Sequence, residues 1–161
     1  MISMIVAVSK ENAIGRDNKM LWYLPKELQH FKQTTLNKTV LMGRKTFESL
    51  GKPLKDRKNV ILTRQKDLKI EGCEIVHTVE EALEKYSQEE LMITGGGEIY
   101  ELFMPYADYI YLTVVDVNIT NADAYFPSIN EKEFLLIDSK FNEKDSKNPY
   151  NFTIYTYKRV N

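Results

Sequence analysis

Residues 2–8, with the sequence Ile-Ser-Met-Ile-Val-Ala-Val, form a nearly continuous apolar run that is rich in β-forming side chains. A strand with one solvated face alternates apolar and polar residues, whereas a strand covered on both faces does not. The run therefore predicts a strand in the middle of an α/β sheet. This one feature places the chain among the layered α/β architectures.

The rest of the chain alternates between predicted strands and helices. Strands are expected at residues 39–42, 59–63, 73–77, 91–94 and 109–117, and helices at 25–35, 44–50, 79–86 and 98–104. Residues 9–18 are polar and are expected to form a long loop. Residues 134–141 and 151–159 are expected to form an antiparallel pair around a polar loop. This order predicts a mostly parallel sheet with an antiparallel C-terminal edge.

Composition excludes several classes of protein. The length of 161 residues favours one domain, and a net charge of −1, from 22 basic and 23 acidic side chains, argues against a broad polyanion-binding surface. The single Cys73 excludes an internal disulfide and a multi-thiolate zinc site, and the two histidines lie far apart, so no metal is expected. The N-terminal stretch shows neither a basic leader nor a cleavage site, so we expect a cytosolic protein.

Two glycine-containing segments lie where a predicted strand is followed by a helix. Residues 94–100 are Thr-Gly-Gly-Gly-Glu-Ile-Tyr, and residues 42–46 are Met-Gly-Arg-Lys-Thr. Glycines let backbone N–H groups approach a ligand, and a helix N-terminus favours phosphate. Arg64 follows a third strand, and together with Arg44 it would suit a phosphate monoester. A merely tight turn and solvated cations are the alternatives, and the spacing leaves both open.

Glu27 shares one face of the predicted helix 25–35 with Leu24, Leu28 and Phe31. A carboxylate within an apolar stripe must be paired, hydrogen-bonded or protonated. Two parallel hydrogen bonds from this carboxylate could hold an amidine-like heterocycle. The alternative is a glutamate at the edge of the stripe that simply favours the helix N-terminus.

For Arg57 and Trp22 the sequence also leaves open whether the residue belongs to a ligand site or has only a structural role. Arg57 lies in a polar stretch before a predicted strand, where it could bind a ligand carboxylate or be surface charge. Trp22 is the only tryptophan and lies beside the long loop, where packing is the alternative to a role at a site.

Taken in order, these segments resemble dihydrofolate reductase of the bacterial chromosomal type, and the resemblance covers nearly the whole chain. The residues that carry it are Ala7, Ile14-Gly15, Trp22-Tyr-Leu-Pro25, Glu27-Leu28, Phe31-Lys32, the stretch Met42-Gly-Arg-Lys-Thr-Phe-Glu-Ser49, Arg57, Gly95-Gly-Gly97, Tyr100, Thr113 and Phe126-Pro127. Each is weak alone, and the ordered set is very specific.

The resemblance implies a three-layer α/β fold in one domain, residues 1–161. A central eight-stranded, mainly parallel sheet with an antiparallel C-terminal strand would be flanked by about four helices. It implies NADPH-dependent reduction of 7,8-dihydrofolate to 5,6,7,8-tetrahydrofolate for one-carbon metabolism, with hydride passing from nicotinamide C4 to pterin C6 and a proton to N5. The expected partners are dihydrofolate, NADPH and antifolate inhibitors such as trimethoprim, with no nucleic acid or membrane, for a cytoplasmic monomer. The alternatives are an NADPH-dependent pyrimidine reductase of riboflavin synthesis and a non-catalytic nucleotide-binding domain of the same fold.

The resemblance also assigns residues to the two ligands. The NADPH set is Ala7, Ile14, Gly15, Gly43, Arg44, Lys45, Thr46, Leu62, Thr63, Arg64, His77, Gly95, Gly96, Gly97, Glu98, Ile99 and Tyr100. The dihydrofolate set is Ile5, Glu27, Leu28, Phe31, Lys32, Leu50, Leu54, Arg57, Thr94 and Thr113. The catalytic set is Glu27, Trp22, Met20 and Thr113. 

Specific roles follow for a few of these residues. Glu27 would hold the pterin 2-amino group and N3 with Thr113, and Arg57 would bind the α-carboxylate of the glutamate tail. A cis peptide would join Gly95 and Gly96. The loop from about residue 9 to 24 would close over the nicotinamide, with Met20 near its tip.

The chain departs from the family pattern at several places, including His77, which stands where a cation near the adenosine phosphate is common. Leu21 stands where proline usually precedes the tryptophan, and Thr94 stands where an aliphatic residue is usual. Residues 121–124, Asn-Ala-Asp-Ala, lack the usual glycine of a loop that steadies the closing loop. We hypothesise that Leu21 and Thr94 lower the sensitivity to diaminopyrimidine antifolates.

Overall fold

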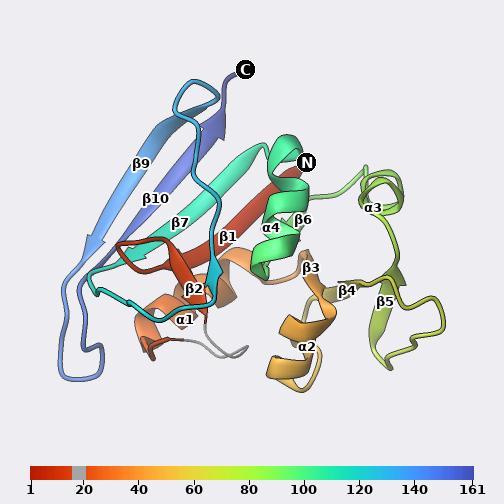
Figure 1. The fold of residues 1–161 in the computed structure, drawn as a ribbon, viewed down its shortest axis with the longest axis horizontal. Coiled ribbons are helices and arrows are strands. Elements are labelled where there is room, and N and C mark those ends of the chain that lie inside the picture. The colour runs from red at the N-terminus through yellow and green to blue at the C-terminus, as the bar shows by residue number, and fades with distance from the viewer. Residues whose placement is uncertain (16–20) are drawn as a thin grey trace.

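Eight strands form one sheet in the computed structural model, which describes residues 1–15 and 21–161 (Figure 1). They are β1 (Ile2–Val8), β3 (Thr39–Gly43), β4 (Lys58–Leu62), β5 (Cys73–Val76), β6 (Leu91–Ile93), β7 (Tyr109–Val115), β9 (Phe134–Asn142) and β10 (Phe152–Arg159). Their order across the sheet is β5-β4-β3-β6-β1-β7-β10-β9. Across the sheet from β5 through β4, β3, β6 and β1 to β7, neighbouring strands pair in parallel. Strand β10 is antiparallel to both β7 and β9. The predicted antiparallel C-terminal strand is confirmed, although the strand at the edge is β9.

Strand β1 lies in the middle of the sheet, between β6 and β7. Six of its seven residues are buried, and the exception, Ala7, is half-buried. Continuous burial is what the apolar run at residues 2–8 predicts, because neighbouring strands and helices enclose it on all sides.

Two layers of helices cover the two faces of the sheet. One apolar cluster joins Met4 and Val6 of β1 to α3 (Val79–Lys85) and α4 (Gly97–Phe103). A second cluster joins Ile5 of β1 to α1 (Pro25–Thr35) and α2 (Arg44–Leu50). Side chains of a strand point alternately to opposite faces, so this division of β1 defines a three-layer fold. The predicted fold class is therefore confirmed.

The predicted loop at residues 9–18 is wrong in one segment. Residues 13–15 form a strand, β2 (Ala13–Gly15), which pairs antiparallel with β8 (Ala124–Tyr125). Strands of two and three residues are too short to show an alternating pattern, so the sequence gives no periodic signal for them. Their pairing fixes the start of the long loop against the segment that follows β7.

The predicted bounds of helices α1 and α2 are confirmed, and the ends of the remaining predicted elements differ from the structure by one or two residues, as at α3 and β7. A short 3₁₀ turn, Met104–Tyr106, follows α4. No helix in the described part of the chain is long and apolar enough to span a membrane.

Candidate active site

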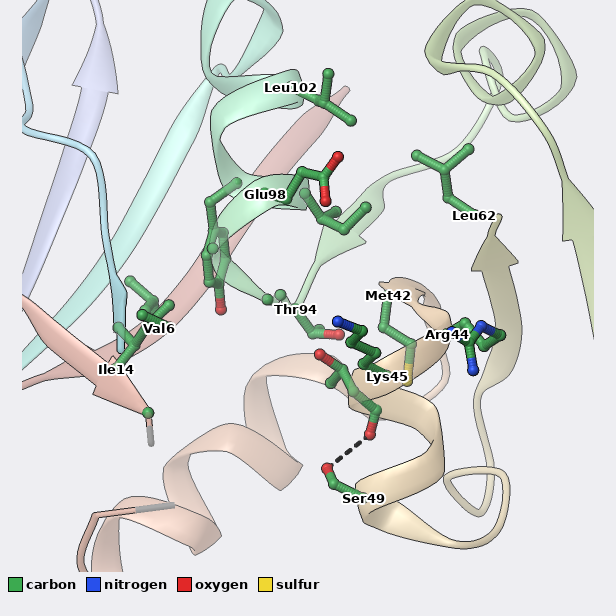
Figure 2. Close-up of a pocket in the computed structure, with 18 of the residues that line it drawn as sticks. Val6, Ile14, Met42, Arg44, Lys45, Ser49, Leu62, Thr94, Glu98 and Leu102 are labelled. Carbon is green, nitrogen blue, oxygen red and sulfur yellow. Dashed lines mark hydrogen bonds between the residues drawn. The ribbon is translucent and has the colours of Figure 1, made fainter. Parts of the chain in front are cut away.

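A cavity of about 880 Å³ opens at the carboxyl ends of the parallel strands. Its wall includes residues at the ends of β1, β3, β4 and β6, together with parts of α1, α2 and α4. Figure 2 shows α2 carrying Arg44, Lys45 and Ser49 on one side, and α4 carrying Glu98 and Leu102 on another. Open α/β sheets bind ligands at this edge, and the volume lies within the range of small-molecule sites.

Most of the residues that the sequence assigns to ligands meet around this cavity. From the dihydrofolate set, the wall contains Ile5, Glu27, Leu28, Phe31, Leu50, Leu54 and Thr94. From the NADPH set, it contains Ala7, Ile14, Gly15, Arg44, Lys45, Thr46, Leu62, Thr63, Arg64, His77, Gly95, Gly96, Gly97, Glu98, Ile99 and Tyr100. Widely separated segments of the chain therefore contribute to one concave surface.

Some predicted residues lie outside the cavity wall of the described structure. Gly43 lies directly behind it, where its N–H donates to the carbonyl oxygen of Gly95 at 2.9 Å. Lys32 is exposed on α1. Met20 falls within residues 16–20, outside the described part of the chain.

Thr113 pairs with a residue of the cavity wall, and Trp22 packs near the start of α1. Thr113 of β7 pairs in register with Ala7 of β1 and is 1% exposed. Register partners of parallel strands share a face, so Thr113 lies on the α1 side of the sheet, with Ala7. Trp22 packs against the apolar cluster of Leu24 and Phe152. Within the described residues, the Thr113 hydroxyl and the Trp22 indole N–H are buried without a hydrogen-bond partner.

Arg57 precedes β4 and is held by neighbouring backbone and side-chain oxygens. Its Nε donates to the carbonyl oxygen of Lys55 at 2.8 Å, and its Nη1 donates to the hydroxyl oxygen of Thr35 at 3.1 Å. Partial burial lowers the pKa of the guanidinium, while Asp56 opposes that change. This places Arg57 at the C-terminal end of α1, on the side where Leu54 reaches the cavity.

Glu27 is one of the most buried residues of α1 and the only acidic one among them. The residue is 5% exposed, although it lines the cavity. Loss of solvation raises the pKa of this carboxyl group to about 7. The structure thus rejects the alternative of a solvated glutamate at the edge of the apolar stripe. The group can exchange a proton near neutral pH or accept paired hydrogen bonds from a ligand.

Tyr100 closes the floor of the cavity beside the triple-glycine turn. It is buried, and its hydroxyl donates to the carbonyl oxygen of Ile5 at 2.7 Å. Burial raises the pKa of its hydroxyl, with a smaller contribution from Glu27. The tyrosine is therefore a neutral hydrogen-bond donor that ties α4 to β1.

The glycine turn has the backbone that the sequence predicts. A cis peptide joins Gly95 to Gly96, which confirms that expectation, and Gly95 has a φ of 115°. A Cβ atom on Gly95 would lie 3.2 Å from the ring of Tyr100, and one on Gly97 would lie 3.3 Å from the carbonyl oxygen of Tyr125. Backbone here lies closer to its surroundings than a side chain would permit. Thr94, just before the turn, donates its hydroxyl to the carbonyl oxygen of Leu41 at 3.2 Å.

Two arginines of the cavity wall have an acidic neighbour, and one ring nitrogen of His77 has a backbone neighbour. Arg44 forms an ion pair with Glu48 one turn along α2. Arg64 lies 3.5 Å from the carboxylate of Glu98, and its side chain is 92% exposed. His77 Nδ1 lies 2.9 Å from the carbonyl oxygen of Thr63. In the described structure no group of three or more His, Cys, Asp or Glu is placed to hold a metal ion.

Sequence reasoning missed several residues of the wall. They are Val6, Met42, Ser49, Gln65, Thr78, Val79, Glu80, Leu102, Asp123 and Ala124. Thr78 was detectable in principle, because it precedes helix α3 and its hydroxyl caps the N–H of Glu81 at 3.0 Å. Asp123 reaches the site through the β2–β8 pairing, where its N–H donates to the carbonyl oxygen of Gly15 at 3.0 Å.

Comparison with known proteins gives a consistent result. The sequence matches the family model described as dihydrofolate reductase over residues 1–159. It is 38% identical to dihydrofolate reductase of Bacillus subtilis, covering 100% of this chain and 96% of that protein. It is 42% identical to dihydrofolate reductase of Lactococcus lactis, covering 99% of this chain and 98% of that protein.

Among solved structures, the chain is similar to dihydrofolate reductase from Enterococcus faecalis complexed with NADP(H) and RAB-propyl. The TM-score is 0.94 at 31% sequence identity, over 100% of this chain and 97% of that one. The arrangement of strands around the cavity is therefore shared with a protein whose structure holds a dinucleotide.

Proposed function

Since the chain belongs to the dihydrofolate reductase family and catalyses the NADPH-dependent reduction of 7,8-dihydrofolate to 5,6,7,8-tetrahydrofolate, we propose which of its residues perform each part of that reaction. The observation that carries the assignment is Glu27, a buried carboxyl group in the wall of a cavity that also holds cations and a glycine turn. The wall with the buried carboxyl group is assigned to the substrate, and the wall with the cations and the glycine turn is assigned to the cofactor.

The cofactor end of the cavity fits a dinucleotide. Gly95 and Gly97 lie too close to Tyr100 and to Tyr125 to carry a Cβ, so the bare backbone of the turn borders the cavity. Arg44, Lys45 and Arg64 supply positive charge for phosphate groups in the same wall. NADPH, when bound, supplies the hydride. The protein holds the reacting carbons together and controls the water around them.

The substrate end fits a flat heterocycle with an amidine-like edge. Glu27 accepts hydrogen bonds from the pterin 2-amino group and N3, and Leu28 and Phe31 cover the ring. The unpartnered hydroxyl of Thr113 supports its role as a second polar partner on the same face. The unpartnered indole N–H of Trp22 supports a role for this residue in binding a polar group beside α1. 

The glutamate tail of the substrate leaves the cavity along α1. Arg57 binds its α-carboxylate, with its guanidinium already oriented by Thr35. Lys32, exposed on the same helix, adds positive charge along this path. Residues 1–161 act as one domain, since the residues assigned to both ligands line one cavity of one sheet. A monomer in the cytoplasm is what the family resemblance implies.

The proposed function is tested by following NADPH oxidation spectrophotometrically with dihydrofolate. Turnover with dihydrofolate is expected, and none is expected with the phosphoribityl substrate of the riboflavin pathway. That substrate needs no buried carboxylate, so its turnover would favour the pyrimidine reductase. NADPH binding without turnover of either substrate would favour a non-catalytic nucleotide-binding domain.

A further inference from the structure

Helix α1 carries Glu27, yet its first turn has no polar residue of its own to cap it. Leu24 occupies the N-cap position without a side-chain hydrogen bond, and Pro25 follows it. The backbone N–H of Lys26 is therefore a donor that the helix cannot satisfy internally. Its acceptor is Oδ1 of Asn148, at 3.0 Å and 122 positions away in the sequence.

Asn148 is itself fixed within the loop between β9 and β10. It is 3% exposed, and its Nδ2 donates to Oδ1 of Asp145 at 2.9 Å. The backbone N–H of Asn148 donates to the same oxygen at 2.8 Å. The other carboxylate oxygen of Asp145 lies 2.9 Å from Nζ of Lys26. One loop thus reaches the first turn of α1 through both a backbone hydrogen bond and an ion pair.

Apolar packing supports the same junction. Leu24 is 1% exposed and packs with Val115 at the end of β7 and Phe152 at the start of β10. Tyr150, in the same connection as Asn148, packs against this cluster. The start of α1 is therefore attached to the C-terminal hairpin by polar and apolar contacts together.

We propose that Asn148, oriented by Asp145, is a remote N-cap of α1 that positions Glu27 toward the substrate. The proposal rests on the proposed role of Glu27 at the pterin. Glu27 directly follows Lys26, so the hydrogen bond from Lys26 N–H to Asn148 fixes the backbone next to the residue that carries the carboxylate. Asparagine is among the strongest N-capping residues, and here it performs that role from another part of the chain.

The experiment compares the full-length wild-type enzyme with Asn148→Ala and the matched control Lys147→Ala. Lys147 is an exposed neighbour whose contribution to the loop is its backbone N–H, which alanine keeps. Amide hydrogen exchange reports the cap directly. We expect exchange in the first turn of α1 to become about fivefold faster in Asn148→Ala, which corresponds to the loss of one cap, and to stay unchanged in Lys147→Ala.

Kinetics report the positioning role. In Asn148→Ala we expect KM for dihydrofolate to rise by about fivefold, while the Kd of NADPH stays at the wild-type value because α2 and α4 are untouched. The swapped variant Asp145→Asn/Asn148→Asp keeps an acceptor for the Lys26 N–H and a donor beside it. It should recover most of the wild-type KM, which a general loss of stability would not explain.

Three outcomes overturn the proposal: unchanged exchange in α1, equal losses for both ligands, or no recovery in the swapped variant. Intact NADPH binding shows that each variant is folded. A wild-type enzyme that does not turn over dihydrofolate would overturn the proposed function and the positioning role with it, whereas the exchange measurement would still decide whether Asn148 caps α1.

Discussion

The two ends of the cavity differ in how far their charged side chains are exposed to solvent. At the substrate end, Glu27 is 5% exposed and is buried against apolar residues. At the cofactor end, Arg64 is 92% exposed and already paired with Glu98. A buried charge is sensitive to every neighbour, whereas an exposed ion pair contributes at most about 1 kcal/mol. The substrate end should therefore depend on one residue, and the cofactor end on several.

The most severe test of this contrast is Glu27→Gln. Glutamine cannot take part in proton exchange, and its amide presents a donor where the pterin requires an acceptor. We expect kcat with dihydrofolate at neutral pH to fall by about a thousandfold, within the range for loss of a general acid–base group. The Kd of NADPH should not change, because the cofactor end is left intact. Steady-state turnover and fluorescence titration of NADPH measure the two quantities.

A matched control for this charge is Glu101→Gln. Glu101 is exposed on α4, and its substitution by glutamine removes one carboxylate, as Glu27→Gln does. It should leave both kcat and NADPH affinity at the wild-type value. If Glu27→Gln weakened NADPH as strongly as it slowed turnover, the division of the cavity into two ends would be wrong.

The same contrast explains what the sequence could predict. The buried strand at residues 2–8 and the segments around Gly43 and Gly95 have characteristic local residue types, so the fold and the glycine-rich side of the cavity were predictable. The burial of Glu27 was not, because helical spacing leaves open whether a stripe position faces the core or its edge. The cap from Asn148 depends on a contact between distant segments, for which a single sequence carries no signal.

A second prediction uses the pH dependence of stability. Burial raises the pKa of Glu27 to about 7 from its ordinary value of 4.5, so the unfolded chain loses this proton at a lower pH than the folded chain. The associated stability is present below about pH 4.5 and is lost as the pH rises to about 7. Glu27→Gln does not titrate. We expect it to be more stable than the wild type by about 3 kcal/mol above pH 7, and equally stable below about pH 4.5.

Urea denaturation at acidic and alkaline pH measures this difference. A stability difference found only at alkaline pH would mean that the negative charge of Glu27, which is proposed to bind the pterin, lowers the stability of the folded chain. A stability difference that is the same at both pH values would show that the carboxyl group keeps its ordinary pKa.

A third prediction concerns the glycines at the cofactor end. Gly95 has a φ of 115°, and a Cβ there would lie 3.2 Å from Tyr100, so Gly95→Ala meets both strain and crowding. We expect it to lose about 2 kcal/mol of stability and to bind NADPH more weakly. Gly51 has a φ of 81° with open space around it. Gly51→Ala should lose about 1 kcal/mol and keep its NADPH affinity. Equal effects on NADPH would remove the glycine turn from the cofactor site.

The smallest expected effects belong to the two arginines proposed to bind the cofactor phosphates. The side chain of Arg44 is 34% exposed and that of Arg64 is 92% exposed, so solvent screens Arg64 more strongly. We expect Arg44→Ala to weaken NADPH by roughly tenfold and Arg64→Ala by roughly threefold. Titrations with NADPH and NADH at low and high salt measure these losses.

The comparison with NADH decides what these cations recognise. NADH lacks the 2′-phosphate, so a cation that binds this group should affect NADPH while leaving NADH affinity unchanged. Losses that are equal for both cofactors would place Arg44 and Arg64 beside the shared pyrophosphate instead. Because each exposed contact is weak, the double variant should lose close to the product of the single losses, unlike the single-residue dependence expected at Glu27.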